Sequence, residues 1–177
     1  NEPNLRNYQP VWDNPTLAGK YWNSLNYRCR ASAFNCRVAA GDFIDSRMAN
    51  ANDSSTSGGE YFDAYQAALS HEPKRWAWHA YKDGEETYAK STAATPDYAG
   101  YWRRTKGFLR ATAGRPVWLT EQGVVRVRNG VALPANGNAV ANAMMRLYVD
   151  DERALTELDP RINMFNYYQW HGEPATE

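Results

Sequence analysis

Two glutamates in this 177-residue chain have surroundings in which a carboxylate often does chemistry. Glu2 lies in an Asn-Glu-Pro turn, and Glu121 closes the apolar run VWLTE. Two carboxylates at separate strand ends that face one cavity can divide the duties of acid and nucleophile, because each perturbs the pKa of the other at short range. This division of roles is the chemistry by which many enzymes cleave glycosidic bonds.

Further polar side chains come at the ends of four short apolar runs that are typical of buried strands. The runs are RVAAGDF (37–43), RWAWHAY (75–81), PVWLTEQ (116–122) and INMFNYYQW (162–170). The carboxyl ends of parallel strands form the working face of α/β proteins, so the polar residues at these ends are expected to gather on one face. They are Asp42, Asp45, His79, Tyr81, Glu121, Gln122, Trp170 and His171.

Helical spacing and capping residues predict four helices that separate these strands. Asn14 and Pro15 favour a helix start, with Leu17, Tyr21, Leu25 and Cys29 on its apolar side. Ser57 and Glu60 form a capping box for a second helix over 57–69. Two more helices are predicted over 95–114 and 138–158. Alternating strands and helices predict parallel strands with right-handed crossovers, in one architectural unit.

Composition excludes several classes of partner. Lys plus Arg and Asp plus Glu each number 20 and neither sign forms a long run, which argues against nucleic acid or an anionic membrane as a partner. No apolar stretch approaches the ~18 residues of a membrane-spanning helix. Aromatic residues make up 14% of the chain, and although most are expected to pack between helices and sheet, those left outside a core would suit sugar rings.

Cys29 and Cys36 are seven residues apart. In an unbroken helix they would be separated by ~10 Å along the axis, too far to bridge, whereas a helix that ends near Ala33 would let the chain fold back. We favour a disulfide that joins the helix end to the next strand, which predicts a secreted or extracellular, bacterial protein. Two unrelated reduced thiols are the alternative.

Four motifs, NEPN, WHAY, WLTEQG and YYQW, in this order resemble the retaining glycoside hydrolases of the (β/α)8-barrel clan A. In that family an Asn-Glu-Pro turn ends strand four with the acid/base, and a Glu ends strand seven as the nucleophile. The resemblance runs from the end of strand four to strand eight. NEP alone is common, so the order of the four motifs carries the resemblance.

The resemblance implies catalytic roles for two residues and substrate contacts for others. Glu2 would protonate the leaving oxygen and later deprotonate water, while Glu121 would attack the anomeric carbon. Asn1 would bind the sugar 2-hydroxyl, and Trp170 would stack on the sugar ring.

Strand alternation puts His79 and Tyr81 on one face. Tyr81 is the candidate hydrogen-bond donor to Glu121, and His79 is expected to line the sugar site. Asp42 is a further candidate for substrate binding. No cofactor and no metal are implied.

We therefore expect an α/β fold, namely part of a (β/α)8 TIM barrel, with residues 1–177 as the C-terminal portion of a single glycosidase domain. Strands one to three and most of strand four would precede Asn1, and a last loop and helix would follow Glu177. The missing N-terminal half of the barrel would then be a structural partner of this chain.

The expected function is hydrolysis of O-glycosidic bonds in a glycoside, oligosaccharide or polysaccharide by a retaining double displacement. The alternative is a non-catalytic carbohydrate-binding barrel or an inactive fragment, because a barrel fold alone does not determine chemistry. A metal-dependent hydrolase would need clustered ligands, and the three histidines (His71, His79 and His171) are scattered. The sequence does not distinguish among sugars or linkages.

Overall fold

The computed structural model describes residues 3–4, 10–31, 36–45, 57–81, 83, 102–112, 114–122, 127–128, 131–132 and 159–167. Its helices are α1 (Pro15–Ala31), α2 (Ser57–Ala67) and α4 (Arg103–Ala111). Its strands are β1 (Ala40–Ile44), β2 (Trp76–His79), β3 (Val117–Gln122), β4 (Val127–Arg128), β5 (Val131–Ala132) and β6 (Ile162–Tyr167).

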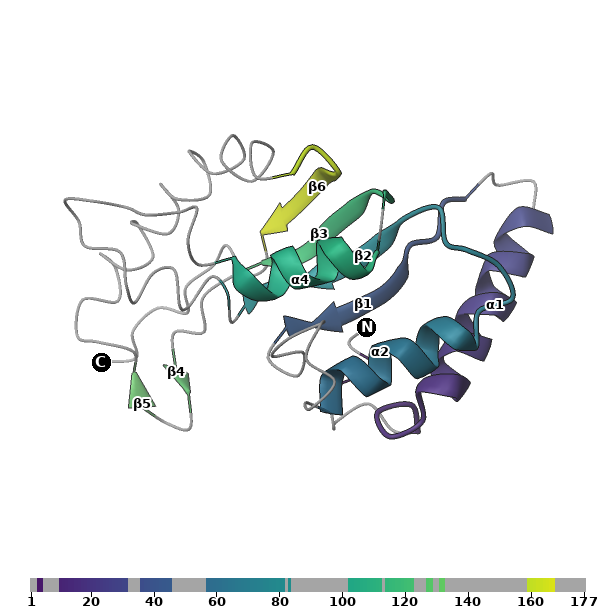
Figure 1. Cartoon of the computed structure of the whole chain (residues 1–177), viewed down its shortest axis with the longest axis horizontal. Coiled ribbons are helices and arrows are strands. Elements are labelled where there is room, and N and C mark those ends of the chain that lie inside the picture. The colour runs from purple at the N-terminus through teal and green to yellow at the C-terminus, as the bar shows by residue number, and fades with distance from the viewer. Residues whose placement is uncertain are drawn as a thin grey trace, which may run out of the picture.

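The main sheet contains four strands in the order β1-β2-β3-β6, as Figure 1 shows, and every neighbouring pair is parallel. The sequence prediction of parallel strands that alternate with helices is therefore confirmed. The short antiparallel pair of β4 and β5 was not predicted from the sequence. The helix predicted over 138–158 lies outside the described residues.

Helix α1 begins as predicted but buries a different face. The Asn14 side-chain oxygen accepts a hydrogen bond from the Leu17 backbone N–H at 2.9 Å, as expected of a cap. The expected apolar side was wrong in part, because Tyr21 and Leu25 are 55% and 58% exposed. The buried face is instead formed by Ala18, Gly19, Trp22 and Cys29.

Close packing of α1 on α2 explains this choice of face. A Cβ atom at Gly19 would lie 2.9 Å from both the Cβ of Ala68 and the carbonyl oxygen of Tyr65, so only glycine allows this approach. The Trp22 indole N–H donates to the Ala39 carbonyl at 3.0 Å, which ties α1 to the residue before β1. These contacts arise from tertiary packing, so the helical spacing of apolar residues in the sequence does not reveal them.

Helix α4 starts later than predicted. Trp102, which the prediction placed inside the helix, precedes it with ψ 47°, outside the helical region, and the helix begins at Arg103. Residues 95–101 of the predicted helix lie outside the described residues. Gly114, expected to stop the helix, follows its end and has a φ of 73°.

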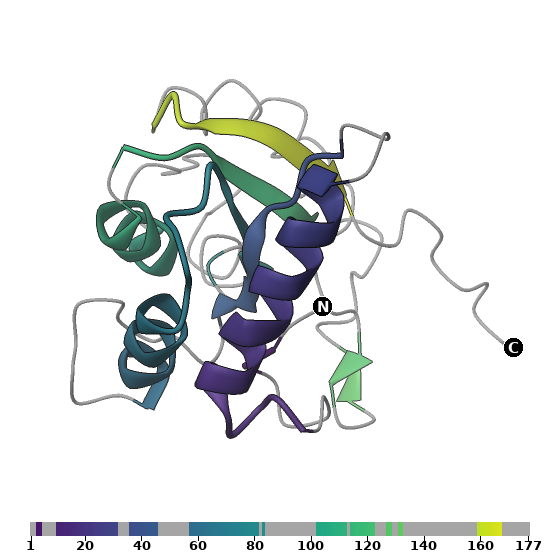
Figure 2. The ribbon, with the colours of Figure 1, turned by 90° about the vertical axis from the view of Figure 1, so that its right-hand side faces the viewer.

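Aromatic side chains fill the core between the sheet and the helices. Figure 2 shows α2 and α4 together on one side of the sheet. Phe43 of β1 makes edge-to-face contacts with Phe62 and Tyr65 of α2 and with Phe108 of α4, which in turn stacks on Trp78 at 4.3 Å. The tryptophans that this core buries are Trp22, Trp76, Trp78 and Trp102, so their large number in the sequence reflects packing in good part.

Candidate active site

A bulge in β1 turns Asp42 away from the regular pleat. Gly41 pairs with Ala77 and Phe43 pairs with the next residue of β2, which leaves Asp42 as an extra residue. Both residues of this bulge have positive φ, 92° for Gly41 and 62° for Asp42. The Gly41 N–H, released from the ladder, donates to the hydroxyl of Tyr65 at 3.1 Å. Bulges of this kind re-aim side chains at the rims of sheets.

A second bulge, in β3, does the same for Glu121. Leu119 pairs with Trp78, whereas Glu121 pairs with His79, so Thr120 is the extra residue. Strict alternation would send neighbouring side chains to opposite faces. Because of the bulge, the side chains of both Thr120 and Glu121 reach the side chains at the carboxyl ends of β1 and β2.

The structure brings together five side chains at the carboxyl ends of three neighbouring strands. The His79 Nε2 lies 2.9 Å from the Asp42 Oδ1, and the His79 Nδ1 lies 3.6 Å from the Glu121 Oε2. The Tyr81 hydroxyl donates to the same Glu121 oxygen at 3.0 Å, and the Thr120 hydroxyl donates to the Asp42 Oδ1. We call these residues the carboxylate cluster: Asp42, His79, Tyr81, Thr120 and Glu121. Thr120 was not identified from the sequence, because no sequence pattern indicates the bulge.

Burial differs sharply within the carboxylate cluster. The side chains of Asp42 and Glu121 are 31% and 22% exposed, whereas His79 has no exposed surface. His79 was expected to line the sugar site, and that contact stays a prediction. Burial works to raise the pKa of Asp42, yet the hydrogen bond and charge of His79 and the Thr120 hydroxyl outweigh it, so the pKa of Asp42 lies below its ordinary value.

The residues next to the predicted acid/base are anchored beside β1. The Asn4 side chain donates to the Ile44 carbonyl and accepts from the Ile44 N–H, both at 3.0 Å, and is buried. The Tyr61 hydroxyl lies 2.9 Å from the Pro3 carbonyl oxygen. The predicted site residues Asn1, Glu2 and Trp170 lie outside the described residues, as does His171.

A second acidic group, which we call the Asp83 network, consists of Asp45, Asp83 and Arg104 and is buried. Asp83 accepts hydrogen bonds from the backbone N–H groups of Arg104 and Thr105 at 3.2 and 2.7 Å, and so caps α4 from a distant part of the chain. The Arg104 guanidinium lies 3.2 Å from the Asp83 Oδ1, and the Asp45 carboxylate accepts from the Asp83 N–H. Burial raises the pKa of Asp83 despite these donors. Asp45, expected on the working face, has no exposed surface and accepts this hydrogen bond from the Asp83 backbone.

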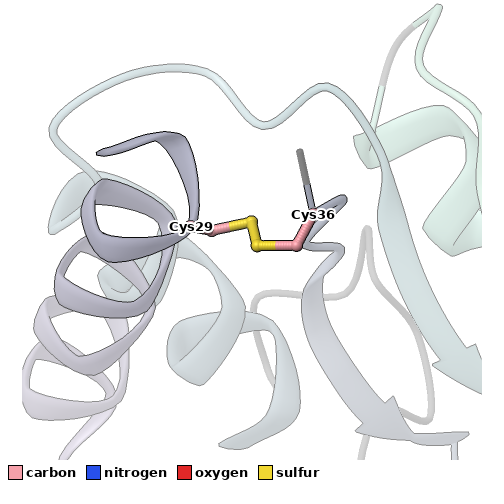
Figure 3. The surroundings of a disulfide bond; sticks show 2 residues. All are labelled: Cys29 and Cys36. Atoms are coloured by element: carbon pink, nitrogen blue, oxygen red, sulfur yellow. A yellow bond between two sulfur atoms is a disulfide. The ribbon is translucent and has the colours of Figure 1, made fainter. Parts of the chain in front are cut away.

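The opposite end of the sheet holds the disulfide and two hollows. Cys29 and Cys36 are joined with their Cα atoms 5.5 Å apart, and Figure 3 shows the link between the end of α1 and the segment before β1. The hollows have volumes of about 430 and 450 Å³ and share Arg30 and His71. No residue of the carboxylate cluster lines either one. We assign the candidate site to the cluster, because parallel α/β proteins act at the carboxyl ends of their strands.

The described part of the chain lacks two features. It contains no group of three His, Cys, Asp or Glu side chains arranged to hold a metal ion. Among its helices, none has the length and apolar character required to cross a membrane.

Comparison of the chain with protein-family models, with curated proteins and with solved structures finds no match.

Proposed function

We propose that this chain carries both catalytic carboxylates of a retaining O-glycoside hydrolase, with Glu121 as nucleophile and Glu2 as acid/base. The observation that carries the proposal is the setting of Glu121. Its carboxylate lies at the end of a parallel strand, is 22% exposed, and accepts a hydrogen bond from Tyr81. A carboxylate that is oriented from one side and open to solvent on another can attack an anomeric carbon.

The register of the sheet supports a pairing of Glu121 with Glu2. Ile44 pairs with His79, and His79 pairs with Glu121, so these residues lie at one level across three strands. Asn4 binds the backbone of Ile44 on the far side of β1, at that same level. Glu2 is two residues from Asn4 in sequence, which favours its carboxylate at the same end of the sheet.

In the barrel that we propose, β1, β2, β3 and β6 correspond to strands five to eight, and the segment with Asn4 follows strand four. Curvature of a closed barrel would bring the ends of strands four and seven to one mouth. A separation of about 5 to 5.5 Å between the two carboxyl groups would then identify a double displacement.

The proposed reaction has two steps. Glu121 attacks the anomeric carbon while Glu2 protonates the leaving glycosidic oxygen, which forms a covalent glycosyl-enzyme. Glu2 then removes a proton from water, which attacks the same carbon and releases Glu121. The Tyr81 hydroxyl holds the attacking carboxylate in one orientation.

Azide rescue tests the assignment of Glu121. In a complete enzyme that contains this chain together with the rest of the proposed barrel, the Glu121→Gly variant is expected to lose hydrolysis of aryl glycosides, and added azide should restore turnover as a glycosyl azide of inverted configuration. The matched control, Glu72→Gly, changes an exposed glutamate and should hydrolyse normally without azide. Sugar binding with no turnover by the complete, unmodified protein would support a carbohydrate-binding barrel instead.

Leaving-group dependence tests the assignment of Glu2. A Glu2→Ala variant should keep the first step on substrates with good leaving groups, which need little proton donation, and lose it on poor ones. Equal loss on both classes of substrate would count against an acid role.

A further inference from the structure

The hollow of about 430 Å³ at the disulfide end of the sheet is lined by an excess of positive charge. Its cationic side chains come from three separate segments of the chain: Arg30, Arg37, Lys74 and Arg75. We call this hollow the basic hollow. The whole sequence has equal numbers of cationic and anionic side chains, so this concentration of charge arises from folding and not from composition.

One acidic residue, Glu72, also lines the basic hollow, but its charge is already balanced. The Arg115 Nε lies 2.7 Å from the Glu72 Oε1, and the Arg115 Nη2 contacts the second carboxylate oxygen. Arg115 itself is not part of the lining. A cation from outside the hollow therefore neutralises Glu72, and the four cations of the lining remain in excess.

Several contacts fix the walls of the basic hollow. The disulfide of Cys29 and Cys36 joins the end of α1 to the segment before β1, as Figure 3 shows, and both cysteines line the hollow. The Arg75 Cζ lies 4.6 Å from the centroid of the Trp118 ring, a contact that orients the guanidinium. Trp22, another residue of the wall, is buried in the core. A site that is formed before its ligand arrives costs less free energy to occupy.

The lining of the basic hollow suits an anion with several oxygen atoms. Three of its four cations are arginines, and a guanidinium binds a phosphate group through two parallel hydrogen bonds. A concave surface lined by charge of one sign raises the local concentration of the opposite charge. Small-molecule sites have volumes of about 300 to 1,000 Å³, so the hollow has room for a phosphate and for a small molecule that carries it.

We propose that the basic hollow binds a phosphate group, either as the free ion or as the monoester of a small molecule. Arg30, Arg37 and Lys74 supply the charge that the phosphate requires. The residues of the carboxylate cluster do not line this hollow. The proposal is therefore independent of the proposed hydrolysis of glycosides.

Isothermal titration calorimetry of the complete, unmodified protein tests the class of ligand. The probes are inorganic phosphate, glucose 6-phosphate and glucose, at constant pH and ionic strength. Both phosphate probes should bind, and affinity should fall when the salt concentration is raised. Tighter binding of glucose 6-phosphate would assign the site to an ester, and equal binding would assign it to the free ion. No binding of either phosphate probe at millimolar concentration and low salt would overturn the proposal.

Single variants test the residues of the basic hollow. Arg30→Gln and Arg37→Gln should each weaken phosphate binding by about 10- to 100-fold, as expected for the loss of a hydrogen bond between charged groups. The matched control is Arg28→Gln, which removes an exposed arginine of the same helix as Arg30 that lines neither hollow. It should bind phosphate as the unmodified protein does. Equal weakening in all three variants would indicate a general effect of surface charge and would overturn the site.

Amide chemical-shift mapping by NMR locates the phosphate in the unmodified protein. Inorganic phosphate should shift the signals of residues 29–30, 36–38 and 71–75, while those of the carboxylate cluster should stay unchanged. Shifts confined to the carboxylate cluster would contradict this inference. The Glu121→Gly variant should bind phosphate normally, so failure of the proposed hydrolysis and failure of the phosphate site are distinguishable.

Discussion

The carboxylate cluster and the Asp83 network both place acidic side chains near the same end of the sheet. Their carboxylates differ in burial and in the groups that donate hydrogen bonds to them. In the network, Asp83 has no exposed surface and its oxygens receive two backbone N–H groups and a guanidinium. In the cluster, Asp42 and Glu121 receive side-chain donors and remain partly exposed. A carboxylate saturated by backbone donors stabilises a fold, whereas one that is oriented by side chains and reachable can act on a ligand.

Glu121→Gln should produce the largest effect on activity and should distinguish the carboxylate cluster from the Asp83 network most clearly. If Glu121 is the nucleophile, kcat/KM for an aryl glycoside should fall by roughly 10⁴-fold or more. The free energy of unfolding should change by less than about 1 kcal/mol, because the amide oxygen can still accept from Tyr81. Steady-state kinetics and urea unfolding measure the two quantities. A stable variant with undiminished turnover would contradict the comparison.

Asp83→Asn should show the reverse pattern. Loss of the charge that faces Arg104 and of one acceptor for the α4 backbone should lower the free energy of unfolding by about 3 kcal/mol. Activity of the folded fraction, measured well below the unfolding temperature, should be retained. Urea unfolding of the variant and of the unmodified chain gives the difference. If the variant is fully stable but inactive, Asp83 belongs to the site and not to the scaffold.

Tyr81→Phe should have an intermediate effect. It removes the donor to Glu121 with little change in shape, and a hydrogen bond to a charged group contributes about 1.5–3 kcal/mol. We therefore expect kcat/KM to fall by about 10- to 100-fold, with a smaller change in thermal stability. Tyr27→Phe, at a tyrosine that is 70% exposed, is the control and should behave as the unmodified protein. Identical kinetics for both variants would leave Tyr81 without a role in orienting Glu121.

The change in stability at acidic pH should be the smallest effect. Its sign should be opposite for Asp42 and Asp83. The pKa of Asp42 is lowered in the folded state, so its stabilisation is present above pH ~3.9 and is lost as the pH falls through the folded value. The pKa of Asp83 is raised, so its contribution is full below pH ~3.9 and is lost as the pH rises through the folded value.

Urea unfolding at several pH values between about 2 and 7 measures both differences. The difference in free energy of unfolding between the unmodified chain and Asp42→Asn should decrease on acidification. The corresponding difference between the unmodified chain and Asp83→Asn should increase. Parallel changes for the two variants would mean that the two carboxylates have similar environments, and would contradict the distinction between cluster and network.

Several features of the molecule follow from local sequence alone. The strands around WAWH and VWLTE, the Asn14 cap and the start of α2 at Ser57 were all predicted, because apolar runs and capping residues act over a few positions. The alternation of strands with helices was enough to predict a parallel sheet, since such connections rarely allow another arrangement. The hydrogen bond from Tyr81 to Glu121 was also expected.

Tertiary structure decided what sequence patterns could not. The bulges at Asp42 and Thr120 re-aim side chains that strict alternation would separate, and they depend on how neighbouring strands pair. The buried face of α1 depends on the close approach of Gly19 to α2, and the start of α4 is capped by Asp83 from outside the helix. Burial of His79 between two carboxylates likewise requires three strands in register. Local sequence determined which segments form, because their causes are local; long-range packing decided which side chains meet, because its partners are distant in the chain.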